Sequence, residues 1–256
     1  MSQYHHSGSY VTLPLLLDNE ETCCTRATTE LWKYLGRMFQ VNQMDFANAL
    51  MQMMYLFISP QKVYSSVQYG KNTKSEFARD DPAFIVLLIA WFCFISTGFG
   101  MILRLDCWHV IKFLSYVIFF DCIGSGLVFA TIFWYVLNKC FHLKTNQKIE
   151  WRFAFDVHLN ALFPALTLIQ WCQLLVFTEV LLYYDWFLIM LIGNTFWLIA
   201  VSYYIYITFL GYNSLQVLKH ATFLLIPLLI SVLLYVMSLI VKFNIAYVWT
   251  LYYTDG

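Results

Sequence analysis

Charged side chains are scarce in this sequence, at 12% of its 256 residues, whereas 61% of the residues are hydrophobic. A soluble domain usually carries charge on about 25% of its residues. The 15 basic and 15 acidic residues cancel to a net charge of zero, so no strong global field would attract nucleic acid. The apolar excess lies after Ala83, which is typical of a multi-pass membrane protein.

Signatures of catalysis and metal binding are also lacking. The sequence has no Gly-x-Ser-x-Gly elbow, no His-Glu-x-x-His motif and no phosphate-cradling glycine loop. Its seven cysteines show neither zinc spacing nor a disulfide framework. The pair Cys23 and Cys24 is either an exposed thiol pair, which we favour, or a palmitoylation site. We therefore expect no enzyme activity, no cofactor and no metal.

The segment before the apolar runs is predicted to hold amphipathic helices. Residues 1–28 are expected to be a disordered cytosolic tail without a signal peptide, and 29–82 a cytosolic or interfacial helical region. Within it, MDFANALMQMMYLF (44–57) has helical apolar spacing but is too short to cross a bilayer, and Pro60 should end it. This helix either packs on the membrane bundle or offers an interfacial, Met-rich surface to a partner. The partner-binding candidates are Phe46, Leu50, Met53, Met54 and Phe57.

Five apolar segments follow, each about 20 residues long, which is the length needed to cross the hydrocarbon of a bilayer. They predict an all-α, polytopic membrane protein with five transmembrane helices in the domain 83–256. The segments are 83–103, 113–137, 159–182, 187–210 and 221–241. Two of them contain a proline, which is tolerable because neighbouring helices can satisfy the freed carbonyls.

Lysine and arginine residues near the ends of these segments predict the orientation in the membrane. One side carries Lys71, Lys74, Arg79, Lys139, Lys144, Lys148, Arg152 and Lys219. The other side carries only Arg104, Lys112 and Lys242. The N-terminus and the loop between the second and third segments should therefore be cytosolic, and the C-terminus lumenal.

Two polar residues fall inside the apolar segments. Asp121 lies in the second segment, and an intramembrane carboxylate usually faces the bundle interior or water. It is either a proton relay or ligand contact, or, as we favour, a hydrogen-bonded residue that holds helices together. Asn194 lies in the fourth segment beside Gly193, where its amide can bridge two helices more readily than it would bind a ligand.

The stretch FDVHLN begins the predicted third segment and supplies Asp156, His158 and Asn160. Asp-x-His alone is a weak metal signal, and Asp156 is suited to a helix N-terminus. Because the first and third segments start on the same side, we expect Arg79, Asp80 and Asp81 to lie level with FDVHLN. One cytosolic-face cluster would result, with Arg79 paired to Asp156. Separate solvated caps are the alternative.

Several stretches, taken in order, resemble the uncoordinated-fifty family of Golgi membrane proteins. They are MDFANALMQMMYLFISPQKVY, FARDDPAFIVLL, FDVHLNA, GNTFWLIA and YYIYITFLGY. The ordered combination is specific, covers about residues 36–243, and leaves the polar tail outside.

The resemblance implies a five-span Golgi protein with a cytosolic N-terminus that supports secretory traffic. The implied roles are delivery of assembled nicotinic acetylcholine receptors to the cell surface and Golgi recruitment of large Arf exchange factors. The expected partners are therefore these factors, receptor cargo and the lipid bilayer. A role in RNA binding at the inner nuclear membrane is also attached to the family. No agreed catalytic residues come with it.

Two other classes of function stay open at this point. One is a small transporter or lipid-handling enzyme that uses Asp121 or the Asp156–His158 pair. The other is an RNA-binding protein that uses the loop from Lys139 to Arg152, although the neutral net charge argues against it. We favour a non-enzymatic trafficking protein, because the lack of catalytic motifs and the resemblance agree on it.

Overall fold

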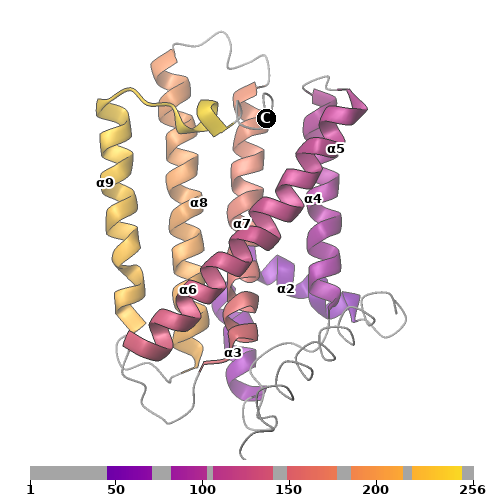
Figure 1. Cartoon of the computed structure of the whole chain (residues 1–256), viewed down its shortest axis with the longest axis vertical. Helices are drawn as coiled ribbons and strands as arrows, with labels where there is room; N and C mark the ends of the chain where they lie inside the picture. The colour runs from indigo at the N-terminus through magenta and orange to yellow at the C-terminus, as the bar shows by residue number, and fades with distance from the viewer. Residues whose placement is uncertain are drawn as a thin grey trace, which may run out of the picture. The chain divides into compact units, whose positions relative to one another are not determined.

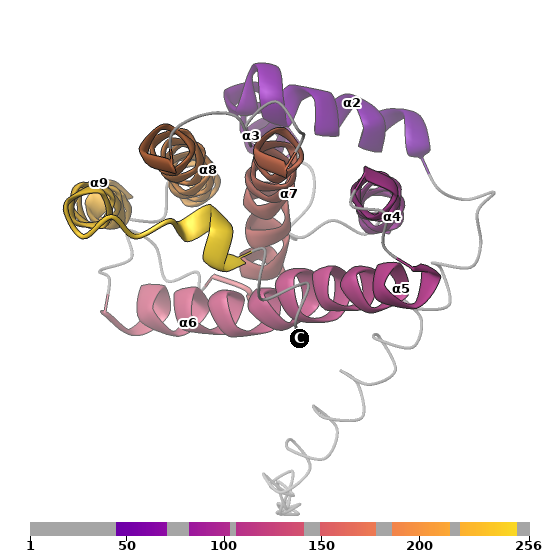
Figure 2. The same cartoon turned by 90° about the horizontal axis from the view of Figure 1, so that it is seen from above.

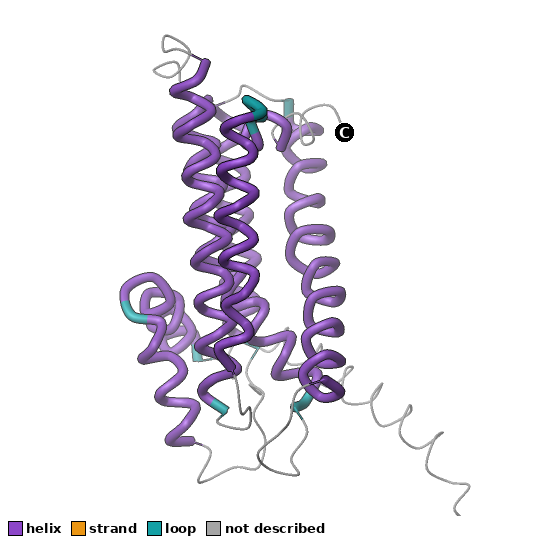
Figure 3. Tube along the Cα trace, turned by 90° about the vertical axis from the view of Figure 1, so that its left-hand side faces the viewer, coloured by secondary structure: helices purple, strands orange, loops and turns teal. Residues whose placement is uncertain are grey.

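The computed structural model describes residues 45–70, 82–102, 106–140, 149–177, 186–215 and 221–249. Every regular element in these ranges is a helix (Figure 3). The elements are α2 (Phe46–Ile58), α3 (Pro60–Gly70), α4 (Ala83–Ile102), α5 (Cys107–Ser115), η2 (Tyr116–Gly124), α6 (Ser125–Cys140), α7 (Trp151–Phe177), α8 (Trp186–Ser214), η3 (Ala221–Leu225) and α9 (Ile226–Ile240). The chain divides into two units, Met1–Met44 and Asp45–Gly256, and the first lies outside the described residues.

The all-α membrane fold is confirmed. Four described helices are long and apolar enough to cross a membrane: Cys107–Lys139, Trp151–Trp171, Trp186–Ser214 and Ala221–Ile240. The remaining predicted span corresponds to α4, whose apolar stretch Ala83–Gly98 falls short of that length. Four of the five predicted spans therefore correspond to helices that are long enough to cross a membrane, and the fifth corresponds to the shorter apolar stretch of α4.

Two helices begin about two turns before the membrane spans predicted for them. The second span begins at Cys107 rather than at 113, because α5, η2 and α6 follow one another without a break. The third begins at Trp151 rather than at 159. There the amide of Asn138 holds the backbone of Ile149, accepting from its N–H at 2.8 Å and donating to its carbonyl at 2.9 Å. This link fixes the chain two residues before α7 starts.

Helix α7 is the centre of the bundle. It packs against α4, α6 and α8, and most of its residues are buried, whereas α9 packs mainly on α8 and exposes most of its surface. Figures 1 and 2 show α4, α7, α8 and α9 side by side, with the continuous helix α5–η2–α6 crossing them obliquely. We call the end where α7 begins the Trp151 end, and the end where α8 begins the Trp186 end.

Two glycines let neighbouring helices approach α7 closely. A Cβ atom at Gly126 of α6 would lie 2.8 Å from Phe155, and one at Gly211 of α8 would lie 2.8 Å from Val157. Real Cβ atoms do not come so near, so a side chain at Gly126 would require the edge of the Phe155 ring to shift, and one at Gly211 would press on both γ-methyls of Val157. Small residues at helix crossings are how membrane bundles pack, since hydrophobic burial gives no driving force between helices in lipid.

The predicted amphipathic helix and its end at Pro60 are confirmed. Helix α2 ends at Ile58, and α3 begins at Pro60, because proline has no N–H to continue a helix but suits a first turn. Asp45 caps α2, accepting from the N–H of Asn48 at 3.0 Å. The two helices pack on α4, α7 and α8.

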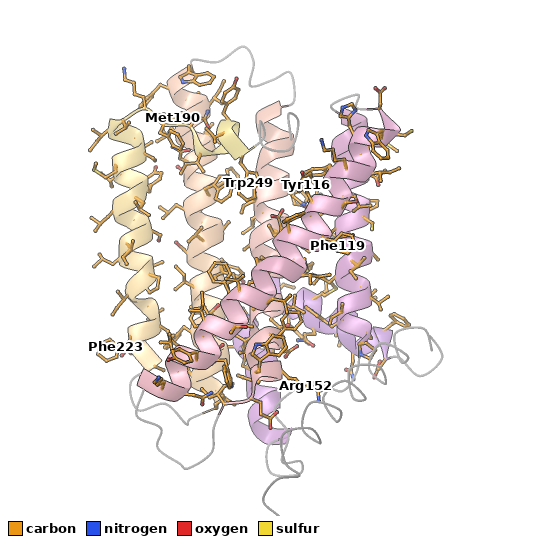
Figure 4. All side chains as sticks on the ribbon, viewed as in Figure 1. Tyr116, Phe119, Arg152, Met190, Phe223 and Trp249 are labelled. Carbon is orange, nitrogen blue, oxygen red and sulfur yellow. The ribbon has the colours of Figure 1, made fainter. Side chains whose placement is uncertain are left out.

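The chain reverses after α9 and returns along the bundle, a feature that the sequence did not predict. Lys242 takes the left-handed conformation, with φ of 58°. The N–H of Phe243 donates to the carbonyl of Ser238 at 2.8 Å, and the N–H of Lys242 donates to the carbonyl of Leu239 at 3.2 Å. These bonds close the C-terminus of α9 in the manner of a Schellman motif. A short helical turn then brings Trp249 against Trp197 of α8, with ring centroids 4.9 Å apart (Trp249 is labelled in Figure 4).

Candidate functional site

A polar network joins three helices inside the apolar bundle. Its centre is His158 of α7, which is 3% exposed. The Nε2 atom of His158 lies 3.2 Å from the hydroxyl of Ser125 on α6, and Nδ1 lies 2.7 Å from the hydroxyl of Tyr204 on α8. Both ring nitrogens therefore have a hydroxyl partner.

The direction of each hydrogen bond follows from the Ser125 hydroxyl, which has one proton. That proton is donated to the backbone carbonyl of Asp121, one turn earlier. Toward His158 the serine oxygen must therefore accept, so we assign the imidazole proton to Nε2. Nδ1 then accepts from the hydroxyl of Tyr204. A neutral imidazole satisfies every group in this chain.

Aromatic rings close the network off from the surrounding membrane. The ring of Phe129 on α6 stacks on His158 with centroids 5.7 Å apart and an interplanar angle of 16°. Tyr204 meets the imidazole edge-to-face at 5.6 Å. The close crossing at Gly126 contributes too, because a Cβ there would lie 3.3 Å from the His158 ring. His158 is thus held by its ring faces as well as by its nitrogens.

Removing one hydroxyl tests the network. Tyr204→Phe should lower the free energy of unfolding by about 1–3 kcal/mol, because Nδ1 of His158 stays buried without a donor. Thermal unfolding of the purified protein in detergent would measure the loss. Tyr135→Phe is the matched control, since it removes an exposed hydroxyl that accepts from Lys139, and exposed groups contribute about 0–1 kcal/mol. Equal stability of the two variants would contradict a stabilising role for the network.

Asp121 lies within η2, the π-helical segment of the second span, and is partly exposed. Its backbone carbonyl enters the network through Ser125. π-Helical turns are rare and often mark functional positions. Asp121 and His158 belong to separate spans, and the structure links them through a serine that carries no motif of its own in the sequence.

The residues of FDVHLN point to different neighbours. Asp156 lies in the second turn of α7 rather than at its start, so the expected N-terminal cap was wrong. His158 bonds to α6 and α8, whereas Asn160 accepts from the side chain of Gln52 on α2 at 3.2 Å. Among the described residues, no group of three His, Cys, Asp or Glu side chains is placed to hold a metal ion.

Three other predicted residues cannot be placed beside them. Arg79, Asp80 and Asp81 lie outside the described residues, so the pairing of Arg79 with Asp156 stays a prediction. The loop considered for RNA binding is described only at its two ends. There Lys139 donates to the hydroxyl of Tyr135 at 2.8 Å, and Arg152 lies exposed at the Trp151 end (Figure 4).

Asn194 forms a clamp on the returning C-terminal segment. Its amide nitrogen donates to the hydroxyl of Ser238 at 3.0 Å and to the carbonyl of Phe243 at 2.8 Å. Its carbonyl accepts from the N–H of Ile245 at 2.9 Å. A Cβ at the adjacent Gly193 would lie 2.9 Å from Ala246, so the segment passes directly over this glycine. The amide thus bridges α8 to α9 and to the chain beyond it.

The partner-binding candidates of α2 divide between two faces. Met53 is 7% exposed and packs inward, so it is not available to a partner. Leu50, Met54 and Phe57 are exposed, at 52%, 57% and 38%. Phe46, at the first position of α2, is partly buried.

Comparison with known proteins identifies the family. The sequence model described as the UNC-50 family matches residues 34–254. The chain belongs to the UNC-50 (uncoordinated-fifty) family. It is 49% identical over 229 residues to the Protein unc-50 homolog of Drosophila melanogaster, covering 88% of this chain and 82% of that one. It is 46% identical to homolog A of Xenopus laevis and 43% identical to the Homo sapiens homolog, each match covering 93% of this chain and 92% of the relative. No solved structure matches it.

These UNC-50 relatives carry names that state no enzymatic activity, and the geometry at Ser125 and His158 fits that. A serine nucleophile needs a histidine whose free nitrogen accepts the hydroxyl proton. Here the serine hydroxyl bonds to a backbone carbonyl, and on the tautomer assigned above the imidazole donates to the serine. The arrangement is the reverse of a nucleophile and its base. It locks α6, α7 and α8 together.

Proposed function

We propose that this UNC-50 family member is a non-enzymatic Golgi membrane protein that supports secretory traffic. It would assist delivery of assembled receptors, such as nicotinic acetylcholine receptors, to the cell surface and recruit Arf exchange factors to the membrane. Family membership over most of the chain supports the proposal. The observation that carries it is the match of the UNC-50 family model to residues 34–254. The His158 network, whose hydrogen bonds tie three helices together, fits a non-enzymatic role.

The orientation proposed for this function places the Trp151 end in the cytosol. Support comes from the lysine and arginine residues of that end, including Lys62 on α3, Lys139 on α6 and Arg152 on α7, which are exposed. Cytosolic connections carry such an excess of positive charge. On this orientation α3 presents its exposed residues Gln61, Lys62 and Ser65 to cytosolic factors.

Charge reversal on the two sides of the membrane tests both orientation and recruitment. In cells that lack the endogenous protein, Lys62→Glu should reduce the Golgi-bound fraction of the Arf exchange factor by about threefold or more, since a surface charge steers association. Lys242→Glu is the matched control, because Lys242 is exposed beyond α9 at the Trp186 end. Quantitative imaging of the factor and surface labelling of the receptor would measure the two activities.

The outcomes separate the proposal from its alternative. Equal recruitment by the Lys62 and Lys242 variants would contradict a cytosolic docking site on α3. The transporter or lipid-handling alternative predicts instead that Asp121→Asn abolishes receptor delivery while the protein still folds and reaches the Golgi. We expect this variant to keep both recruitment and delivery, because the network uses the backbone carbonyl of Asp121.

A further inference from the structure

Helix α2 is attached far from the ends of the spanning helices. Gln52 bonds to Asn160 of α7, and the hydroxyl of Tyr203 on α8 donates to the carbonyls of Leu56 and Phe57 at 2.8 and 3.0 Å. At a rise of 1.5 Å per residue, the stretch from Trp151 to Asn160 is about 14 Å long, and that from Tyr203 to Ser214 about 16 Å. Helix α2 therefore lies well inside the span of the bundle, across the direction of α7 and α8 (Figure 2).

Protein groups pair several of the backbone groups at the two ends of α2. At its N-terminus the side chain of Asp45 accepts from the N–H of Asn48. At its C-terminus the N–H of Ser59 donates to the carbonyl of Tyr55, and the hydroxyl of Tyr203 donates to the carbonyls of Leu56 and Phe57. A helix in water can leave its terminal groups to solvent, whereas one in hydrocarbon needs them paired within the protein.

The outward face of α2 has no charge and few polar atoms. The inward face is formed by Ala49, Met53 and Leu56. The exposed stripe is formed by Leu50, Met51, Met54 and Ile58, which are 52%, 57%, 57% and 73% exposed. These four residues follow helical spacing, so they form one continuous apolar strip on the side away from the bundle.

We propose that α2 lies in the acyl-chain region of the bilayer leaflet at the Trp151 end, with this exposed stripe against lipid tails. Its depth along α7 and α8, the pairing of its ends and the apolar outward face all fit hydrocarbon. Interfacial helices commonly sit about 5–10 Å below the headgroups. Helix α2 itself has no charge. Its flanking charges are Asp45, its exposed N-cap, and Lys62, which lies over the ring of Tyr55 at 5.6 Å, as a lysine reaching toward the headgroups would. The stripe is then a lipid-binding surface, and a protein partner recruited at this end would bind elsewhere.

Site-specific photocrosslinking in native membranes tests this placement independently of the trafficking function. A benzophenone amino acid is placed at Leu50 or Met54 of the full chain, with Ser65 of α3 as the matched exposed position. After irradiation, mass spectrometry should find phospholipid adducts at 50 and 54, at a yield about tenfold above that at 65, because a water-facing residue does not meet acyl chains. Protein adducts as the main product at 50 and 54 would overturn the proposal in favour of a docking surface.

Access of a charged reagent gives a second measurement. Leu50→Cys and Ser65→Cys variants in phosphatidylcholine vesicles are treated with a sulfonated maleimide, and the labelling of the wild-type cysteines is subtracted. Labelling at 50 should be about tenfold slower than at 65, since an ionic reagent enters hydrocarbon poorly. Equal rates at the two positions would place α2 in water and overturn the proposal, whether or not the protein recruits exchange factors.

Discussion

Replacing Asn194 with leucine is expected to lower the free energy of unfolding by about 2–4 kcal/mol, because two partly buried backbone groups lose their partners. Leucine has nearly the shape of asparagine, so the loss reports hydrogen bonds rather than packing. The carbonyl of Phe243 and the N–H of Ile245 would face apolar surroundings, whereas Ser238 keeps its bond to the carbonyl of Tyr235. Thermal unfolding of the purified protein in detergent measures the change.

The effect should be confined to the C-terminal return. Asn213→Leu is the matched control, since Asn213 is an exposed asparagine on the same helix and surface substitutions usually stay within about 0.5 kcal/mol. The Asn194 variant should also release residues 243–249, which limited proteolysis would detect as cleavage that the control resists. If both variants unfold at the same temperature, the clamp does not stabilise the fold.

The sequence predicts local features of this molecule well. The apolar spacing of residues 44–57 and the position of Pro60 were enough to place α2 and its end, because both signals act within a few residues. The apolar runs after Ala83 likewise predicted membrane helices. The sequence did not predict which face of α2 packs on the bundle and which is exposed. Met53 belongs by spacing to the same stripe as Leu50, yet one is buried and the other exposed, since the neighbours that cover α2 come from distant segments.

The polar sites depend on tertiary contacts and on irregular backbone. A π-helical segment shifts the inward face of the second span, so that buried Val117 is followed by buried Cys122, five residues on, a spacing that helical periodicity does not predict. At His158 the local pattern offers only the weak metal signal of Asp-x-His, because its partners Ser125 and Tyr204 lie on other helices. For the return of the chain after α9 the sequence offered one local signal, Gly193 beside Asn194. This pair indicates that another segment crosses α8 closely, but it does not indicate which segment.

The second large effect is expected at Gly211, where α3, α7 and α8 meet. Gly211→Val should lower the free energy of unfolding by about 3 kcal/mol, at the upper end of what overpacking usually costs. The new Cβ would lie 2.8 and 2.9 Å from the two γ-methyls of Val157 and 3.3 Å from the ring of Tyr64. Val157 cannot turn away easily, because a β-branched side chain in a helix has one strongly preferred rotamer. Helix α8 must therefore move off α7.

Gly98→Val is the control for this substitution. Gly98 lies on α4, and a Cβ atom there would have no neighbouring atom within 4 Å, so the same change should stay within about 0.5 kcal/mol. The comparison separates the loss of a close helix crossing from any general effect of valine in a membrane helix. Because α8 also carries Tyr203, which holds the C-terminus of α2, the Gly211 variant should loosen α2 as well. Faster labelling of Leu50→Cys in the Gly211→Val background would show that coupling, and an unchanged rate would show that α2 stays in place when α7 and α8 separate.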